Sequence, residues 1–129
     1  MADKWNLDGV SVDISNNMTV TNNLAVGGTL TVTGGTTQVV SEYVATGAID
    51  PTDSFVSLDG TTSGSMTLAA GADGAQMTVI CVNSDNTVDI DADFGAAIAT
   101  ATFTVGDGIT MISQDDVWYI TGNNGVILS

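Results

Sequence analysis

The sequence predicts an all-β protein in which a short, hexad-repeat trimeric β-stalk precedes a small antiparallel β-sandwich or barrel. Three observations support this fold class. A six-residue repeat runs four times across residues 12–35, short apolar alternations separated by Gly, Asp and Asn clusters fill residues 48–129, and no segment has the pattern of a helix. We therefore expect an N-terminal arm at residues 1–11, the stalk at 12–35, a transition at 36–47 and the sandwich or barrel module at 48–129.

The repeat reads VDISNN, MTVTNN, LAVGGT and LTVTGG. In each hexad two apolar side chains stand two residues apart, so they share one face of a short extended segment. The Asn and Gly residues near the end of each hexad tolerate the positive φ angles of a sharp corner. Each hexad should form one strand and one corner, and the apolar residues expected in the oligomer core are Val12, Ile14, Met18, Val20, Leu24, Val26, Leu30 and Val32.

Four hexads of one chain are too short a solenoid to cover their own apolar face. Three identical chains wound around a shared axis would bury that face and let strand edges pair between chains, which predicts a homotrimer. The alternative is a β-meander in which the same segments are hairpin strands of a larger sandwich, because Asn-Asn and Gly-Gly pairs also suit two-residue turns. Strands of only three residues favour the trimer.

The charge balance excludes several classes of function. Lys4 is the only basic side chain beside fifteen carboxylates, and the net charge of −14 would repel nucleic acids and anionic membranes. The chain has no His to act as a base near neutral pH and no Arg to clamp a phosphate. A carboxylate pair of the glycosidase kind is the remaining enzymatic option, and no motif marks one. We expect a protein that is not an enzyme, with no catalytic residues and no cofactor.

Cys81 stands alone inside an apolar run at residues 77–82, which predicts a buried free thiol. The first residues lack the basic start and apolar core of a signal peptide, and no apolar stretch has the length of a membrane span. The expectation is synthesis in the cytoplasm, and the missing signal peptide disfavours a bacterial surface adhesin.

Strands are expected in the second part of the chain at residues 54–58, 65–68, 77–83, 87–90, 97–105, 109–113, 117–121 and 126–128. Within the fifth of these, alternation should turn one set of side chains to the core, namely Ala99, Ala101, Phe103 and Val105. Trp118 and Tyr119 are neighbours on one strand, so one should lie in the core while the other faces outward.

Two groups of residues are candidates for binding. Trp5 and Leu7, in an otherwise polar arm, either insert into a partner or cap the open end of the stalk. Asp89, Asp91 and Asp93 alternate and would line one strand face, which makes them a weak candidate for calcium. The run lacks the Gly and Glu of a calcium-binding hand loop, so a solvated strand face is the better interpretation and no metal is expected.

The run LAVGGTLTVTGGTTQ resembles the repeated stalk segments of tailed-bacteriophage fibre and spike proteins, which are trimers of interwound β-strands. The two runs SFVSLDGTTSGSMTLAAGADGAQMTVICV and VGDGITMISQDDVWYITGNNGV resemble a small β-rich module of phage virion proteins, including capsid decoration proteins and head fibres. Together the two resemblances cover most of the chain. No catalytic residues come with either of them.

The resemblance implies a virion structural protein, made in the host cytoplasm and located on the capsid surface. Four hexads are far fewer than a long tail fibre has, which favours a compact homotrimeric capsid decoration (cement) or head-fibre protein bound to the major capsid protein. The alternative is a tail-fibre or spike module that recognises a host glycan, with Tyr119 or Tyr43 stacking on sugar.

Overall fold

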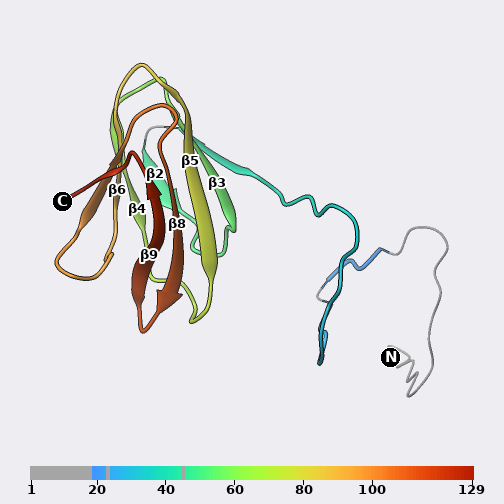
Figure 1. The fold of residues 1–129 in the computed structure, drawn as a ribbon. Helices are drawn as coiled ribbons and strands as arrows, with labels where there is room; N and C mark the ends of the chain where they lie inside the picture. The colour runs from blue at the N-terminus through green and yellow to red at the C-terminus, as the bar shows by residue number, and fades with distance from the viewer. Residues whose placement is uncertain (1–18, 23, 45) are drawn as a thin grey trace, which may run out of the picture. The chain divides into compact units, whose positions relative to one another are not determined.

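The computed structural model describes residues 19–22, 24–44 and 46–129, and the chain separates into two compact units, Met1–Gly35 and Thr36–Ser129. All regular structure among the described residues is β and lies in the second unit (Figure 1). The strands are β1 (Ser41–Val44), β2 (Gly47–Ile49), β3 (Phe55–Gly60), β4 (Gly64–Leu68), β5 (Gln76–Ser84), β6 (Val88–Asp91), β7 (Thr100–Phe103), β8 (Gly108–Gln114), β9 (Val117–Asn124) and β10 (Ile127–Leu128). The described residues hold no helix long and apolar enough to cross a membrane.

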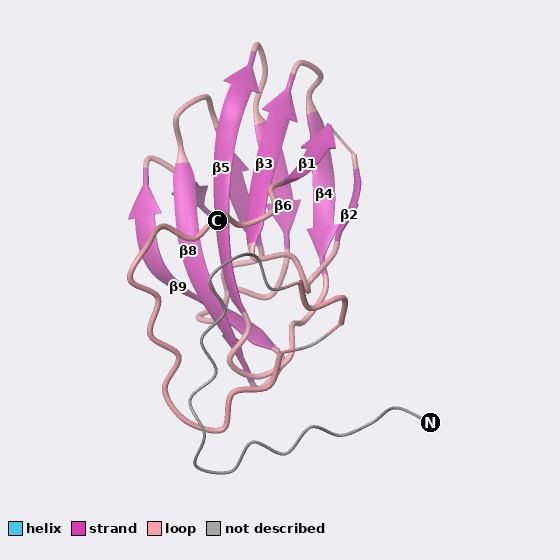
Figure 2. Ribbon diagram, turned by 90° about the vertical axis from the view of Figure 1, so that its right-hand side faces the viewer, coloured by secondary structure: helices cyan, strands magenta, loops and turns pink. Residues whose placement is uncertain are grey.

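The strands form two five-stranded sheets, which we name sheet A (β1-β3-β5-β8-β9) and sheet B (β10-β7-β6-β4-β2). From β1 to β6 the chain alternates between the sheets, and each strand pairs in parallel with the strand two before it. Val56 of β3, for example, pairs with Ser41 of β1 on one side and with Val79 of β5 on the other. The first six strands therefore make three turns of a flattened coil, whose parallel arrows are visible in Figure 2.

The predicted all-β class is confirmed, and the two facing sheets are consistent with a small sandwich that is not closed into a barrel. The strand order differs from the expected antiparallel one, because only β5-β8-β9 and β6-β7-β10 are antiparallel. The reason is the alternation between sheets. Strands that follow each other in the chain lie in different layers and cannot form a hairpin, so neighbours within a layer run the same way.

Each of the eight predicted strands is present, whereas β1, within the expected transition at 36–47, and β2, at its end, were not predicted. The strand expected at 97–105 is shorter, because Gly95, Ala96 and Ala97 all have positive φ angles and form a tight turn before it. Ala101 and Phe103 are buried as predicted. The core prediction is wrong for Ala99, which is exposed, and for Val105, which is 59% exposed beyond the end of β7.

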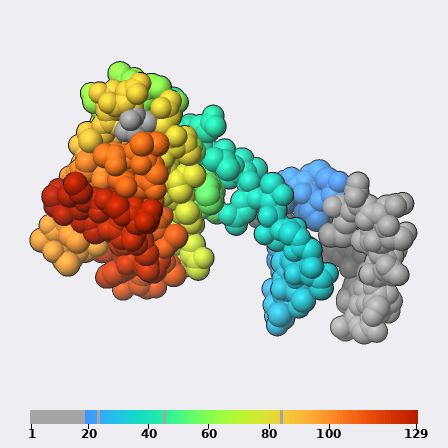
Figure 3. Space-filling model, turned by 45° about the horizontal axis from the view of Figure 1, so that its top comes forward, coloured from blue at the N-terminus to red at the C-terminus, as the bar shows by residue number. Residues whose placement is uncertain are grey.

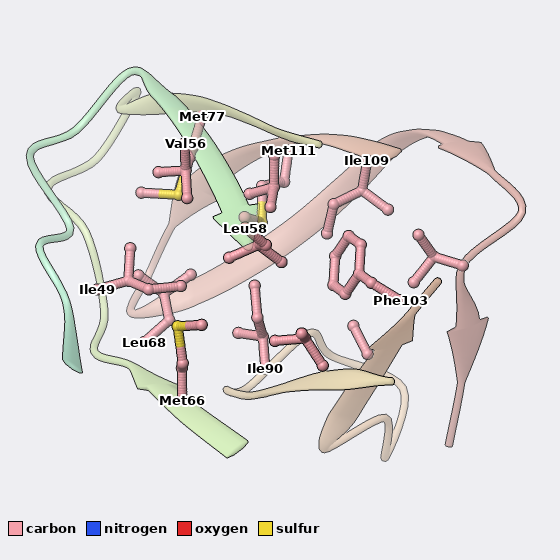
Figure 4. Packing of buried hydrophobic residues seen from close by; sticks show 14 of the residues in the cluster. Ile49, Val56, Leu58, Met66, Leu68, Met77, Ile90, Phe103, Ile109 and Met111 are labelled. Carbon is pink, nitrogen blue, oxygen red and sulfur yellow. The ribbon is translucent and has the colours of Figure 1, made fainter. Parts of the chain in front are cut away.

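One hydrophobic core lies between the sheets (Figure 4). Sheet A contributes alternate residues such as Val56, Leu58 and Val79, and sheet B contributes Met66 and Ile90 from the opposite side. This alternation is what a strand with one buried face requires.

The predictions for three further side chains of sheet A are confirmed. Trp118 is 1% exposed and belongs to the core, while its neighbour Tyr119 is 48% exposed on the other face of β9. The Cys81 side chain is buried, at 2% exposure, and its thiol donates to the Asn83 carbonyl at 3.7 Å.

The loop between β4 and β5 is fastened over the indole ring of Trp118. The indole N–H donates to the Ala69 carbonyl at 2.9 Å, and the Ser113 hydroxyl donates to the Gly71 carbonyl at 2.9 Å. A Cβ atom at Gly71 would lie 2.6 Å from Cζ2 of Trp118, so a glycine is required where the loop passes the ring. The loop is thus held by the hairpin of β8 and β9, whose bonding residues lie 42 and 49 residues further along the chain.

Candidate functional site

The described part of the hexad repeat presents its apolar side chains to solvent. Residues 19–22 and 24–35 contain no strand, so the expected strands are not formed by the chain alone. All five apolar hexad positions in these residues are exposed: Val20 by 42%, Leu24 by 56%, Val26 by 43%, Leu30 by 64% and Val32 by 51%. Exposed apolar patches of this kind are common at protein interaction surfaces.

Five residues with predicted roles lie outside the described part of the chain. They are Trp5 and Leu7, expected to bind a partner, and Val12, Ile14 and Met18, expected in the oligomer core. Their roles stay predictions.

The charge of the chain is distributed very unevenly. From residue 14 to residue 41 there is no Asp, Glu, Lys or Arg, although the chain as a whole carries a net charge of −14. Identical acidic chains repel each other wherever their carboxylates face each other, and like charges brought together at an interface cost several kcal/mol. Residues 14–41 are therefore the part of the sequence in which charge repulsion between two copies would be smallest.

The three aspartates considered as a metal site do not form one. Asp89 and Asp91 lie on β6, but Asp93 lies beyond the strand end, where its carboxylate accepts the Gly95 N–H at 2.9 Å. Among the described residues no three His, Cys, Asp or Glu side chains are grouped so that they could hold a metal ion. Oδ1 of Asp89 is shielded from solvent and accepts no hydrogen bond.

Asp91 belongs to a polar row across the outer face of sheet B. Its carboxylate accepts hydrogen bonds from the hydroxyl groups of Ser65 on β4 and Thr100 on β7, the latter at 2.9 Å. The hydrogen bond from Ser65, and then the one from Thr100, hold the pKa of Asp91 below its usual value because they stabilise the charged form. The arrangement links three strands and explains this carboxylate as part of the sheet.

The two tyrosines considered for sugar stacking differ in their surroundings. The Tyr43 hydroxyl donates to the Asp53 carboxylate at 2.7 Å and accepts the Asp50 N–H at 2.9 Å, so it fastens the turn between β2 and β3. Partial burial, which disfavours the phenolate, raises the pKa of Tyr43. Tyr119 is the one of the two whose ring is open to solvent, at 48% exposure.

A shallow groove of about 340 Å³ crosses the outer face of sheet A. Its lining includes Gly108 and Gly122, beside Ile80 and Thr110 respectively. A Cβ atom at Gly122 would lie 2.7 Å from Oγ1 of Thr110, so the groove depends on this glycine. The groove offers shape and apolar surface, and we assign no chemistry to it.

Comparison with known proteins identifies no relative: no family model, no curated protein and no solved structure matches this chain.

The sequence predictions missed the surface formed by residues 36–40, which we call the leading segment because it directly precedes β1. It lies in no strand, and its Val39 is 86% exposed, the largest exposure among the large hydrophobic residues described. The absence of charge is the sequence signal that could have found it, since this segment lies within the uncharged stretch.

Proposed function

We propose that this protein is a homotrimeric structural protein of a tailed-phage particle, of the capsid decoration or head-fibre type, bound to the major capsid protein. The observation that carries the proposal is the hexad repeat, whose regularly spaced apolar side chains are exposed in the single chain. A trimer would bury them along a common axis, as the resemblance to phage stalk segments implies.

The chemistry of the described residues suits a structural role at a protein surface. The module is a small sandwich-like β unit, and the uncharged stretch at residues 14–41 would let copies meet while the carboxylates elsewhere keep the assembly soluble. A trimer that touches several shell subunits adds buried interface that must be broken before the shell opens. Such multivalent contact makes individually weak contacts sufficient.

A pair of matched variants tests the trimer. Leu30→Asp places a carboxylate on the repeat, and Val105→Asp places one on the module at nearly the same exposure, 64% against 59%. If the repeat is the trimer core, native mass spectrometry should give three chains of 13.1 kDa for the wild type and for Val105→Asp, and a single chain for Leu30→Asp. A monomeric wild type at micromolar concentration, or a trimeric Leu30→Asp, would contradict the proposal.

The location on the particle needs a separate experiment. Antibody label spread over the heads of particles, together with earlier genome loss on heating when the protein is absent, is the result expected of a decoration protein. Label confined to the tail would favour the alternative, a module that recognises a host glycan. The exposed ring of Tyr119 is the observation that favours this alternative, and Tyr119→Ala should then weaken binding to host cells.

A further inference from the structure

The edge strands on the two sides of the module differ in how far other parts of the chain cover them. β9 is the edge strand of sheet A on one side. There the backbone N–H of Trp118 donates to the Asp93 carbonyl at 2.9 Å, so the loop between β6 and β7 covers part of that edge. This loop and the final strands, orange and red, lie side by side in Figure 3. At the other side, β1 pairs only with β3 and β2 only with β4 among the described residues. Their outer edges have free backbone groups, which is the usual site for strand addition.

The leading segment has the composition of a strand that lacks a partner. Residues 36–40 read TTQVV, and Thr and Val are residues that favour β-strands. The side chains of Val39 and Val40 are 86% and 48% exposed. A hollow of about 440 Å³ lies between this segment and Phe55, so apolar surface remains open beside the first strands of the module.

We infer that the leading segment of one copy adds as a β-strand to the free edge of β1 in a neighbouring copy. The segment cannot lie beside β1 of its own chain, because Val40 is bonded directly to Ser41 and leaves no residues for a turn. The partner must therefore come from another molecule.

A second copy of this chain is the partner that the charges favour. Between residues 36 and 49 the only charged side chain is Glu42, so two copies of this acidic protein can approach here with little repulsion. The contact joins two different surfaces, a segment and an edge, and such a contact closes into a ring when three copies are related by a threefold axis.

This inference rests on the proposed trimer, because the repeat lies directly before the leading segment. Once three repeats associate, the segments and edges are held at an effective concentration of the order of mM.

Hydrogen exchange of the full-length protein tests the inference. In an unpaired edge strand alternate amides exchange rapidly, whereas an added strand protects them. We expect alternate amides of residues 36–40, and the β1 amides that point away from β3, to exchange at least about tenfold more slowly in the wild type than in Val39→Lys. Val105→Lys is the matched control and should exchange like the wild type, because Val105 is also exposed but far from β1 in the sequence and on no strand.

Proline substitutions give a second, independent measurement. In a strand, adjacent N–H groups point to opposite sides, so only one of Gln38 and Val39 would donate to the neighbouring β1. Exactly one of Gln38→Pro and Val39→Pro should therefore abolish the protection, while both variants keep the melting temperature of the module.

The outcomes separate this inference from the proposed trimer. If the wild type is a trimer and its β1 amides become faster to exchange in Val39→Lys, both proposals are supported. If the wild type is a dimer with the same change in exchange, the strand addition is supported and the trimer is refuted. A trimer whose β1 amides exchange at alternate positions, or in which the two proline variants behave alike, overturns the strand addition and leaves the repeat as the only interface. A monomer overturns both.

Discussion

Replacing Gly71 by alanine should destabilise the module, because the new methyl group would clash with the indole ring of Trp118. A smaller ring at residue 118 should relieve the clash. The added Cβ would lie 2.6 Å from Cζ2 and 2.9 Å from Cη2 of Trp118, and 3.1 Å from Cβ of Ser113. The indole cannot simply move away, because its N–H is bonded to the Ala69 carbonyl at 2.9 Å and its ring is 1% exposed. Overpacking of this kind costs about 1–3 kcal/mol.

The assay is urea unfolding followed by far-ultraviolet circular dichroism, for the wild type, Gly71→Ala, Trp118→Phe and the double variant. Phenylalanine lacks the part of the indole ring that the new Cβ would meet. Gly71→Ala should therefore cost less than about 1 kcal/mol in the Trp118→Phe background, although Trp118→Phe itself destabilises the protein.

The reasoning would be refuted by strict additivity, in which Gly71→Ala has the same cost with and without the indole. A change in the urea dependence of the unfolding free energy would show instead that the variants alter the unfolded state, and melting temperatures then provide the comparison.

Three further predictions concern turns and the polar row of sheet B. Asp115 and Asp116 both have positive φ angles, 52° and 63°, so the double substitution to Asn and Gly should raise the unfolding free energy by about 1 kcal/mol in urea titrations. Tyr43→Phe removes two hydrogen bonds and should lower the same free energy by about 1–2 kcal/mol, whereas an unchanged value would mean that the turn holds without them. The lowered pKa of Asp91 adds stability above about pH 4 that is lost as pH falls through the folded-state pKa. Asp91→Asn should therefore make the unfolding free energy depend less on pH in the acid range, and an unchanged pH dependence would contradict the reasoning.

The sequence predicted most strands because period-two alternation is a local signal. β8 follows it along its length, and β5 is marked by the apolar run at residues 77–82, so both were found almost to their ends. β1 and β2 were missed because SEYV and GAI are too short to establish a period. Parallel pairing could not be predicted from local patterns. Ser41 of β1 pairs with Val56 of β3, and between these strands in the sequence lies β2, which belongs to the other sheet.

The candidate sites were harder to predict than the strands. The expected face of three aspartates required β6 to continue to residue 93, but the strand ends at Asp91. The turn that shortens β7 depends on Ala96 and Ala97 in a left-handed conformation, which alanine rarely adopts and which no local pattern signals. The apolar hexad positions were visible from spacing alone, and it is their exposure in the single chain that adds new information.

The alternation of the first six strands between the sheets has a consequence for dividing the protein. Neither sheet is made from a continuous stretch of sequence, so any single cut between β2 and β9 leaves strands of both sheets in each fragment. Halves expressed separately should remain unfolded until they are mixed, and proteolytic nicking of a loop between β2 and β9 should weaken both layers together. We expect the module to unfold as one unit, with no stable half-folded state.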